Sequence, residues 1–216
     1  MKRAALLLAA VAAALGLAAT ARAYETPEEA SGTVSASLNA YWSGVFAQLG
    51  RRYTSPSTVV WYEAQQPTAC GGTKSHNAMY CPLDKTIYVD RWLFAHFTFE
   101  LQLPFAIATV IAHEWGHAVQ DQFGLFRPVR RRPGPMPQLE WEADCYAGMW
   151  TRWAYDNGEL GEAAVSDGLA LMIAAGDPPG TPRYFGHGSS DERATHFLRG
   201  YATQSLRECG RVLYGG

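Results

Sequence analysis

VIAHEWGHAV, at residues 110–119, is the segment that indicates most about the fold and the chemistry expected of this chain. Residues four apart in an α-helix are rotated by about 400°, so His113 and His117 lie on one face, one turn apart. Two imidazoles placed in this way can occupy neighbouring corners of a tetrahedral zinc site. Glu114 lies about 100° further around the helix, where its carboxylate can reach a water on the metal and act as a general base.

The flanks of this motif favour a buried helix that carries a site. Pro104 suits the first turn of a helix and Gly124 suits its end, so we expect the helix to run from about Pro104 to Phe123. The residues on both sides of the motif are uncharged. The alternative is a pair of histidines without a metal, and a chance match of that kind would more often fall in a polar stretch.

A third ligand is expected from the next predicted helix, which contains LEWEAD at residues 139–144. Glu140 and Asp144 share a face at the i, i+4 spacing. The pattern resembles the ExxxD arrangement of the gluzincins, HExxH peptidases whose third ligand is a Glu on a following helix. That resemblance implies that Glu140 is the third ligand and that Asp144 accepts a hydrogen bond from His113. Glu142 is off this face, and we expect it at the rim or in solvent.

Another zinc pattern is excluded by the sequence itself. The metzincin pattern HExxHxxGxxH would need Gly at the position of Gln120 and His at the position of Phe123.

The four cysteines predict two disulfides. An even number of cysteines in an exported chain usually forms disulfides, and no CxxC pair indicates a cysteine-ligated metal. Cys70–Cys81 would close a short Gly-rich loop, and Cys145–Cys209 would then tie a helix to the C-terminal region. The other two pairings stay open.

The N-terminal segment 1–23 has the pattern of a secretory signal peptide. Lys2 and Arg3 precede an apolar run at 4–19, and an A-x-A site ends at Ala23. The run is short for a spanning helix, so we expect cleavage after Ala23 and export to the periplasm or the extracellular space. Cleavage removes three bases and no acids, which takes the formal net charge from −2 to −5.

Composition narrows the classes of protein. The chain has 216 residues, of which 48% are hydrophobic and 18% charged, which is typical of one globular domain. A slightly acidic chain is not expected to bind nucleic acid through bulk charge. The mature part contains no apolar run long enough to span a membrane. The oligomeric state stays open.

The residue patterns predict a mainly helical α+β fold with a short β-sheet. Apolar residues at helical spacing, together with Pro, Gly and capping signals, mark the helices, and runs of β-branched and aromatic residues mark the strands. Ser189 and Glu192 form a predicted capping box. We expect helices at 27–50, 104–123, 138–156, 161–175 and 189–207, strands at 58–63 and 86–90, and loops at 64–85 and 127–137.

Four ordered segments carry a resemblance to a known family. CPLDKTIYVD, HEWGHAVQ, LEWEADCYAGMW and HGSSDERATHF resemble the bacterial neutral zinc metallopeptidases, over about residues 58–210. The resemblance implies a zincin-like metallopeptidase domain, which we place at 58–216, with Zn²⁺ as cofactor and a protein or peptide as substrate. Residues 24–57 would be an N-terminal helix or arm, and the sequence leaves open whether they are a propeptide.

The sequence therefore predicts a secreted zinc-dependent endopeptidase. Two alternatives remain: a zinc-stabilised binding or assembly protein that does not cleave, and a zinc amidase that acts on cell-wall cross-links. Glu114 argues against the first, because a purely structural metal site has no use for a general base.

Further candidates surround the motif. His187 precedes the last predicted helix and could donate to a developing oxyanion. Residues 86–90 could be an edge strand that pairs with an extended substrate, although plain sheet core is the commoner role. Arg193 could pair with a buried acid or contact substrate.

Overall fold

The computed structural model describes residues 23–126, 137–181 and 186–210. The fold is mainly helical α+β with a small sheet, as the sequence predicted. The predicted signal peptide, apart from Ala23, and nearly all of the expected loop at 127–137 lie outside the described residues. The helices are α1 (Pro27–Gln48), α2 (Arg91–Ala95), the π-helix η1 (His96–Glu100), α3 (Ala106–Gln122), α5 (Pro137–Asp156), α6 (Glu162–Ala174), α7 (Ser190–Thr203) and α8 (Leu206–Cys209).

The main sheet has three strands in the order β1-β5-β4. Strand β1 (Thr58–Tyr62) runs parallel to β5 (Thr86–Asp90), and β4 (Ala78–Cys81) pairs with β5 in the antiparallel direction. A separate small hairpin joins β2 (Pro67–Thr68) to β3 (Gly71–Gly72). The expectation of a plain loop at 64–85 was therefore wrong, because β4 is a strand through its pairing with β5, which local composition does not reveal.

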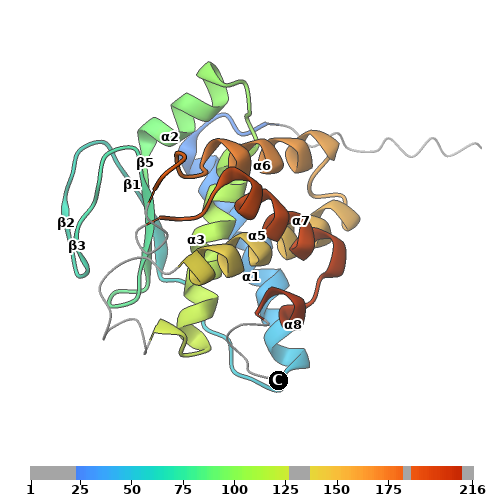
Figure 1. Ribbon diagram of the computed structural model, residues 1–216. Coiled ribbons are helices and arrows are strands. Elements are labelled where there is room, and N and C mark those ends of the chain that lie inside the picture. Colours follow the sequence, from blue (N-terminus) through green and yellow to red (C-terminus); the bar gives the residue numbers. More distant parts are fainter. Residues whose placement is uncertain (1–22, 127–136, 182–185, 211–216) are drawn as a thin grey trace, which may run out of the picture.

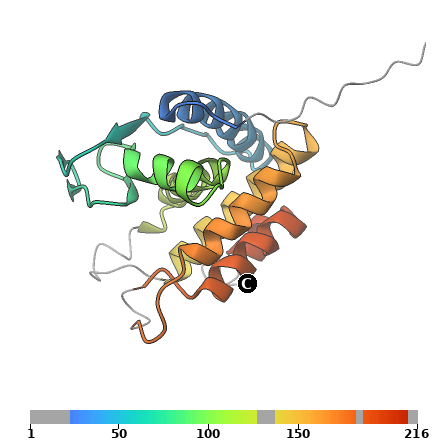
Figure 2. The same ribbon diagram turned by 90° about the horizontal axis from the view of Figure 1, so that it is seen from above.

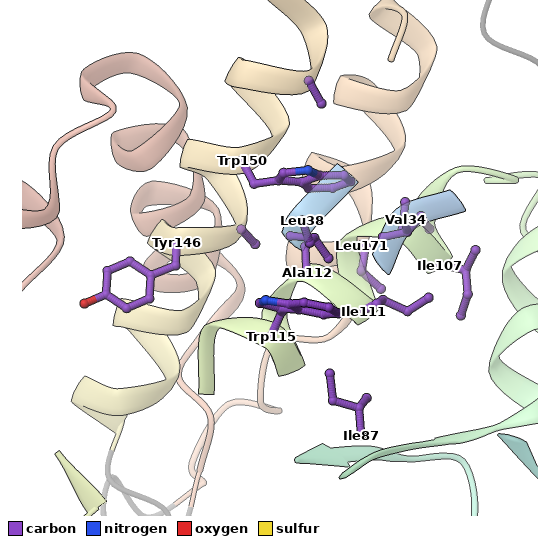
Figure 3. Packing of buried hydrophobic residues seen from close by; sticks show 14 of the residues in the cluster. Val34, Leu38, Ile87, Ile107, Ile111, Ala112, Trp115, Tyr146, Trp150 and Leu171 are labelled. Atoms are coloured by element: carbon purple, nitrogen blue, oxygen red, sulfur yellow. The ribbon is translucent and has the colours of Figure 1, made fainter. Parts of the chain in front are cut away.

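Helix α3 lies at the centre of the molecule. In both ribbon views the sheet lies to one side of α3, while α5, α6 and α7 lie to the other (Figures 1 and 2). Figure 3 shows the α3 side chains Ile111 and Trp115 between Ile87 of β5 and Trp150 of α5. All four side chains are at most 3% exposed. A helix covered on this many sides provides a rigid platform for the residues of the HExxH motif.

Helix α1 belongs to the same core. Thr26 caps its N-terminus by accepting from the Glu29 amide, and Pro27 is its first residue. The helix contacts both α3 and α5, and one face of it is buried. The buried residues of that face are Ala30, Val34, Leu38, Tyr41, Trp42 and Phe46.

Two glycines allow the helices around the site to approach closely. A Cβ on Gly116 of α3 would lie 3.0 Å from the Cα of Ala143 on α5. A Cβ on Gly200 of α7 would clash with the backbone oxygen of Cys145 on α5. Helix α5 is thus held tightly between α3 and α7.

The last predicted helix is broken in two. The capping box of Ser189 and Glu192 is present at the start of α7, as the sequence predicted. Gln204 then adopts a left-handed conformation with φ of 46°, which ends α7 before α8 begins. Helix α2 and the π-helix η1 were not predicted.

Two disulfides, one local and one long-range, are formed among the described residues. Cys70 pairs with Cys81, and Cys145 of α5 pairs with Cys209 of α8. This is the pairing that the sequence favoured. Disulfides of this kind fit an exported protein, because the cytosol keeps thiols reduced. None of the helices in the described part of the chain is both long and apolar enough to cross a membrane.

Candidate metal centre

Helix α3 presents three residues of the HExxH motif together. His113 and Glu114 are 7% and 6% exposed, and His117 is partly buried. The N-terminus of the helix is fixed by Asp167 of α6, whose carboxylate accepts from the Phe105 amide at 2.9 Å. The helix is therefore anchored about two turns before the motif begins.

Helix α5 brings Glu140 to the two histidines. An Oε atom of Glu140 lies 3.2 Å from Nε2 of His113 and 3.6 Å from Nε2 of His117. The close contact of Gly116 with Ala143 permits this approach, because a side chain at 116 would push α5 away. Among the described residues, these three form a group whose ligand atoms all lie within 4.8 Å of one another.

The donor set fits zinc. Two ligands at zinc–nitrogen or zinc–oxygen distances in a tetrahedral site lie about 3.3 Å apart. The separations of Glu140 from the two Nε2 atoms, 3.2 and 3.6 Å, bracket that value. Two imidazoles and one carboxylate are also a ligand set that zinc prefers.

The charges of the cluster also call for a cation. Burial opposes ionisation of Glu140, but His117 and His113 outweigh it and hold the pKa of its carboxyl well below the usual range. Burial likewise opposes protonation of His113, but Asp144 and Glu140 raise the pKa of its imidazole to about 10. Burial also opposes protonation of His117, but the carboxylate of Glu140 outweighs this effect and raises the pKa of the His117 imidazole. The buried carboxylates of Glu140 and Asp144 are therefore stabilised by positive charge nearby, which either protons on the histidines or a bound metal ion can provide.

His113 is oriented by Asp144. Nδ1 of His113 lies 2.7 Å from an Oδ atom of Asp144, which is fully buried. Arg193 of α7 binds both oxygens of Asp144, from Nε at 2.9 Å and from a terminal nitrogen at 2.7 Å. Arg193 thus pairs with a buried acid, which was one of its two expected roles. With Nδ1–H donated to Asp144, the Nε2 lone pair of His113 is free for a metal.

His117 is oriented differently. Its Nδ1 lies 2.8 Å from Oε1 of Gln120, and Gln120 in turn donates to Glu142 on α5. Glu142 is 1% exposed, so the expectation that it lies at the rim or in solvent was wrong. Helix α5 is covered on several sides, which leaves the Glu142 face inside the protein. Burial raises the pKa of Glu142. In the sequence, the contact of Gln120 with His117 was indicated only by their spacing, because residues three apart are neighbours on the surface of a helix.

Glu114 faces a cavity of about 480 Å³ together with the three candidate ligands. His187 lines the same cavity, with a half-exposed side chain and its Nδ1 3.8 Å from Asp177. Leu93, Phe97, Val110, Leu171, Met172 and Ala175 form an apolar part of the wall. His76, which the sequence did not mark as a site residue, also lines the cavity and stacks on Trp92 at 4.0 Å.

The strand beside the cavity is β4. Residues 86–90 form the central strand β5 and pair on both sides, which is the plain sheet-core role that the sequence favoured, so they are not the edge strand that was the other candidate role. Ala78, Met79 and Tyr80 of β4 line the cavity instead. The edge of the sheet nearest the candidate ligands therefore belongs to a strand that the sequence did not predict.

Comparison with known proteins identifies the family of the chain. The sequence model of a family described as "putative neutral zinc metallopeptidase" matches residues 9–212, nearly the whole chain. The chain belongs to this family. The motifs that carry the resemblance are those on α3, α5, α7 and β5, and three of them supply the groups just described.

Relatives in this neutral zinc metallopeptidase family include two proteins named as uncharacterized. YpfJ of Escherichia coli K12 is 30% identical over 188 residues, which cover 78% of this chain and 65% of YpfJ. Rv2575 of Mycobacterium tuberculosis H37Rv is 31% identical over 183 residues, which cover 73% of this chain and 62% of that protein. The chain thus spans somewhat less than two thirds of the length of these relatives. No solved structure matches it.

Proposed function

We propose that this chain is a secreted zinc-dependent endopeptidase. The observation that carries the proposal is the convergence of His113, His117 and Glu140 beside Glu114 in one cavity. A structural zinc site is closed by four protein ligands, whereas a catalytic site keeps a position open. Three candidate ligands facing a cavity match the catalytic type.

Each residue takes a defined role in this proposal. His113, His117 and Glu140 hold the metal, and Asp144 fixes the tautomer of His113. Zinc bound there would supply Lewis acidity that activates water and polarises a peptide carbonyl. Glu114 accepts the proton of the attacking water and then delivers it to the leaving amine. His187, on the cavity wall, donates a hydrogen bond to the oxyanion that develops on the carbonyl.

The shape of the cavity supports a peptide substrate. Strand β4 lies beside the candidate ligands, and an extended peptide can add to a strand through backbone hydrogen bonds. The apolar wall formed by α2, η1, α3 and α6 can bury an apolar side chain of such a peptide. Backbone pairing is independent of side-chain identity, which suits an endopeptidase.

The proposed extent of the mature protein follows from the same features. We place cleavage of the signal peptide after Ala23, and the disulfides support export to the periplasm or the extracellular space. The segment 24–57 is proposed to be a permanent arm of the 58–216 domain. The burial of α1 against α3 and α5 supports this role over that of a removable propeptide.

Glu114→Gln tests the reaction. The amide keeps the size of the carboxyl group but cannot accept the proton, so cleavage of an unfolded protein such as casein should fall by at least about 100-fold. The zinc content should stay at the level of the wild type. Retained cleavage would contradict the role of Glu114. Full zinc content with no cleavage by the wild type would favour a zinc-stabilised binding protein or an amidase.

A further inference from the structure

A chain of buried hydrogen bonds extends from His117 into the protein. Gln120 donates from Nε2 to the Leu139 carbonyl at 2.7 Å and to a Glu142 oxygen at 3.0 Å. The hydroxyl of Tyr146 donates to the other oxygen of Glu142 at 2.9 Å. Gln120, Glu142 and Tyr146 are at most 1% exposed. The chain links α3 to the same turn of α5 that carries Glu140.

Hydrogen-bond accounting fixes the orientation of Gln120. The Leu139 carbonyl can only accept, so the amide nitrogen of Gln120 must point toward it, and the same nitrogen then donates to a Glu142 oxygen. Its amide oxygen therefore points toward His117. Because an amide oxygen only accepts, Nδ1 of His117 must carry the hydrogen, and Nε2 is left as the free ligand atom.

We infer that Glu142 is a positioning residue that acts through Gln120 to hold His117 as a metal ligand. The inference rests on the proposed zinc site and assigns a role within it to two residues that do not contact the metal. A glutamine free to turn could present its amide nitrogen to His117, and this would favour the tautomer with the hydrogen on Nε2. Glu142 and the Leu139 carbonyl prevent that rotation. Partners of this kind typically affect metal affinity by about 10- to 100-fold.

The role assigned to Glu142 depends on its acceptor atoms rather than on its charge. A glutamine at 142 would keep an oxygen for Gln120, and its amide could donate to the Tyr146 hydroxyl, which also accepts. A leucine at 142 would fill a similar volume but leave Gln120 without one of its two acceptors. The comparison of these two variants therefore shows whether Glu142 acts by accepting a hydrogen bond from Gln120 or only by filling space in the core.

The test measures the zinc dissociation constant by competition with a chromogenic chelator. We expect Glu142→Leu to weaken zinc binding by about tenfold or more, and Glu142→Gln to remain within about threefold of the wild type. Gln120→Met, which removes the acceptor for His117, should match Glu142→Leu. Thr151→Val is the control, because Thr151 is a buried polar residue of the same helix whose hydroxyl donates to the Ala147 carbonyl. It should bind zinc as the wild type does.

Visible absorption of the cobalt-substituted protein provides a second measurement. A change in how His117 is held alters the ligand field, so Gln120→Met and Glu142→Leu should shift the cobalt spectrum, whereas Thr151→Val should not. Wild-type zinc affinity in both Gln120→Met and Glu142→Leu would overturn the inference. Equal losses of zinc affinity in Glu142→Gln and Glu142→Leu would also overturn it, because the negative charge of Glu142, and not its acceptor atoms, would then support zinc binding. Absence of zinc binding by the wild type would instead refute the proposed function.

Discussion

The two histidines of the candidate metal centre are supported in different ways. His113 is backed by a carboxylate, Asp144, whose charge is matched by Arg193 from α7. His117 is backed by the neutral amide of Gln120, which is held by Glu142. Both arrangements place the hydrogen on Nδ1 and free Nε2 for the metal. The same tautomer is thus obtained once with a buried ion pair and once with a relay of hydrogen bonds.

The two supports depend on different parts of the fold. A buried carboxylate beside one histidine needs a cation, and Arg193 must come from a helix about fifty residues further along the chain. The amide relay needs only α3 and the first turns of α5. We therefore expect changes on the His113 side to affect stability strongly, and changes on the His117 side to affect mainly metal binding.

The largest expected effect comes from Asp144→Leu. It leaves the buried Arg193 without its bidentate partner, which should cost about 3–5 kcal/mol of unfolding free energy, in addition to weaker zinc binding. Denaturant unfolding measures the loss. Asp156→Asn is the matched control, because it removes an exposed ion pair with Arg152 and should cost less than about 1 kcal/mol. A loss for Asp144→Leu no larger than that of the control would remove the distinction between the two supports.

A dependence on pH separates the metal-free from the zinc-loaded protein. The pKa of His113 rises from the ordinary 6.5 to about 10, so its proton stabilises the metal-free fold fully below about pH 6.5. This stabilisation is lost as the pH rises toward 10. Unfolding of chelator-treated protein should become easier over that window. Zinc replaces the proton, so the loaded protein should not show the same decline, and identical profiles for the two forms would contradict the assignment.

Gly116→Ala tests the approach of the two helices, on which both supports depend. The added Cβ would lie 3.0 Å from the Cα of Ala143, so α3 and α5 must separate slightly. We expect a cost of about 1–3 kcal/mol from overpacking, partly offset by up to about 1 kcal/mol of better helix propensity. Zinc affinity should fall as well, because Glu140 moves away from the histidines. An increase in stability with unchanged zinc affinity would show that the contact does not set the ligand geometry.

The smallest expected effect is that of Tyr146→Phe. It removes the hydrogen bond from the Tyr146 hydroxyl to Oε1 of Glu142, but it leaves the bond from Gln120 to Oε2 in place. We expect a loss of stability of about 0.5–1.5 kcal/mol and little change in the zinc dissociation constant. Chelator competition and thermal unfolding on the same preparation measure the two quantities. A loss of zinc affinity as large as that of Glu142→Leu would extend the positioning network to Tyr146.

The sequence was informative where the chemistry lies on one helix or repeats at helical spacing. The HExxH segment predicted the helix around His113 and His117, and the i, i+4 spacing predicted that Glu140 and Asp144 share a face. The contact of Asp144 with His113 was implied by the resemblance to gluzincins. Each of these inferences needs only the geometry of one helix and a known pattern for the next one.

The residues that were misjudged depend on tertiary packing. Glu142 was expected at the rim or in solvent because it lies off the face of Glu140, but it is only 1% exposed, since α5 packs against both α3 and α7. Strand β4 depends on pairing with β5, which comes later in the chain, and its residues lie between Gly- and Pro-containing turns. No local pattern could have assigned Arg193 to Asp144, since the two lie on different helices.

Metal content of the purified protein tests whether His113, His117 and Glu140 bind zinc. Wild type and Glu140→Ala should be compared after dialysis against buffered zinc, with Glu208→Ala, a change on the short helix α8, as the control. The structure predicts one zinc per chain in the wild type and the control, and a large loss in Glu140→Ala, because two histidines alone hold zinc weakly. Absence of zinc in the wild type, or full zinc content in Glu140→Ala, would show that these three residues do not form the metal site.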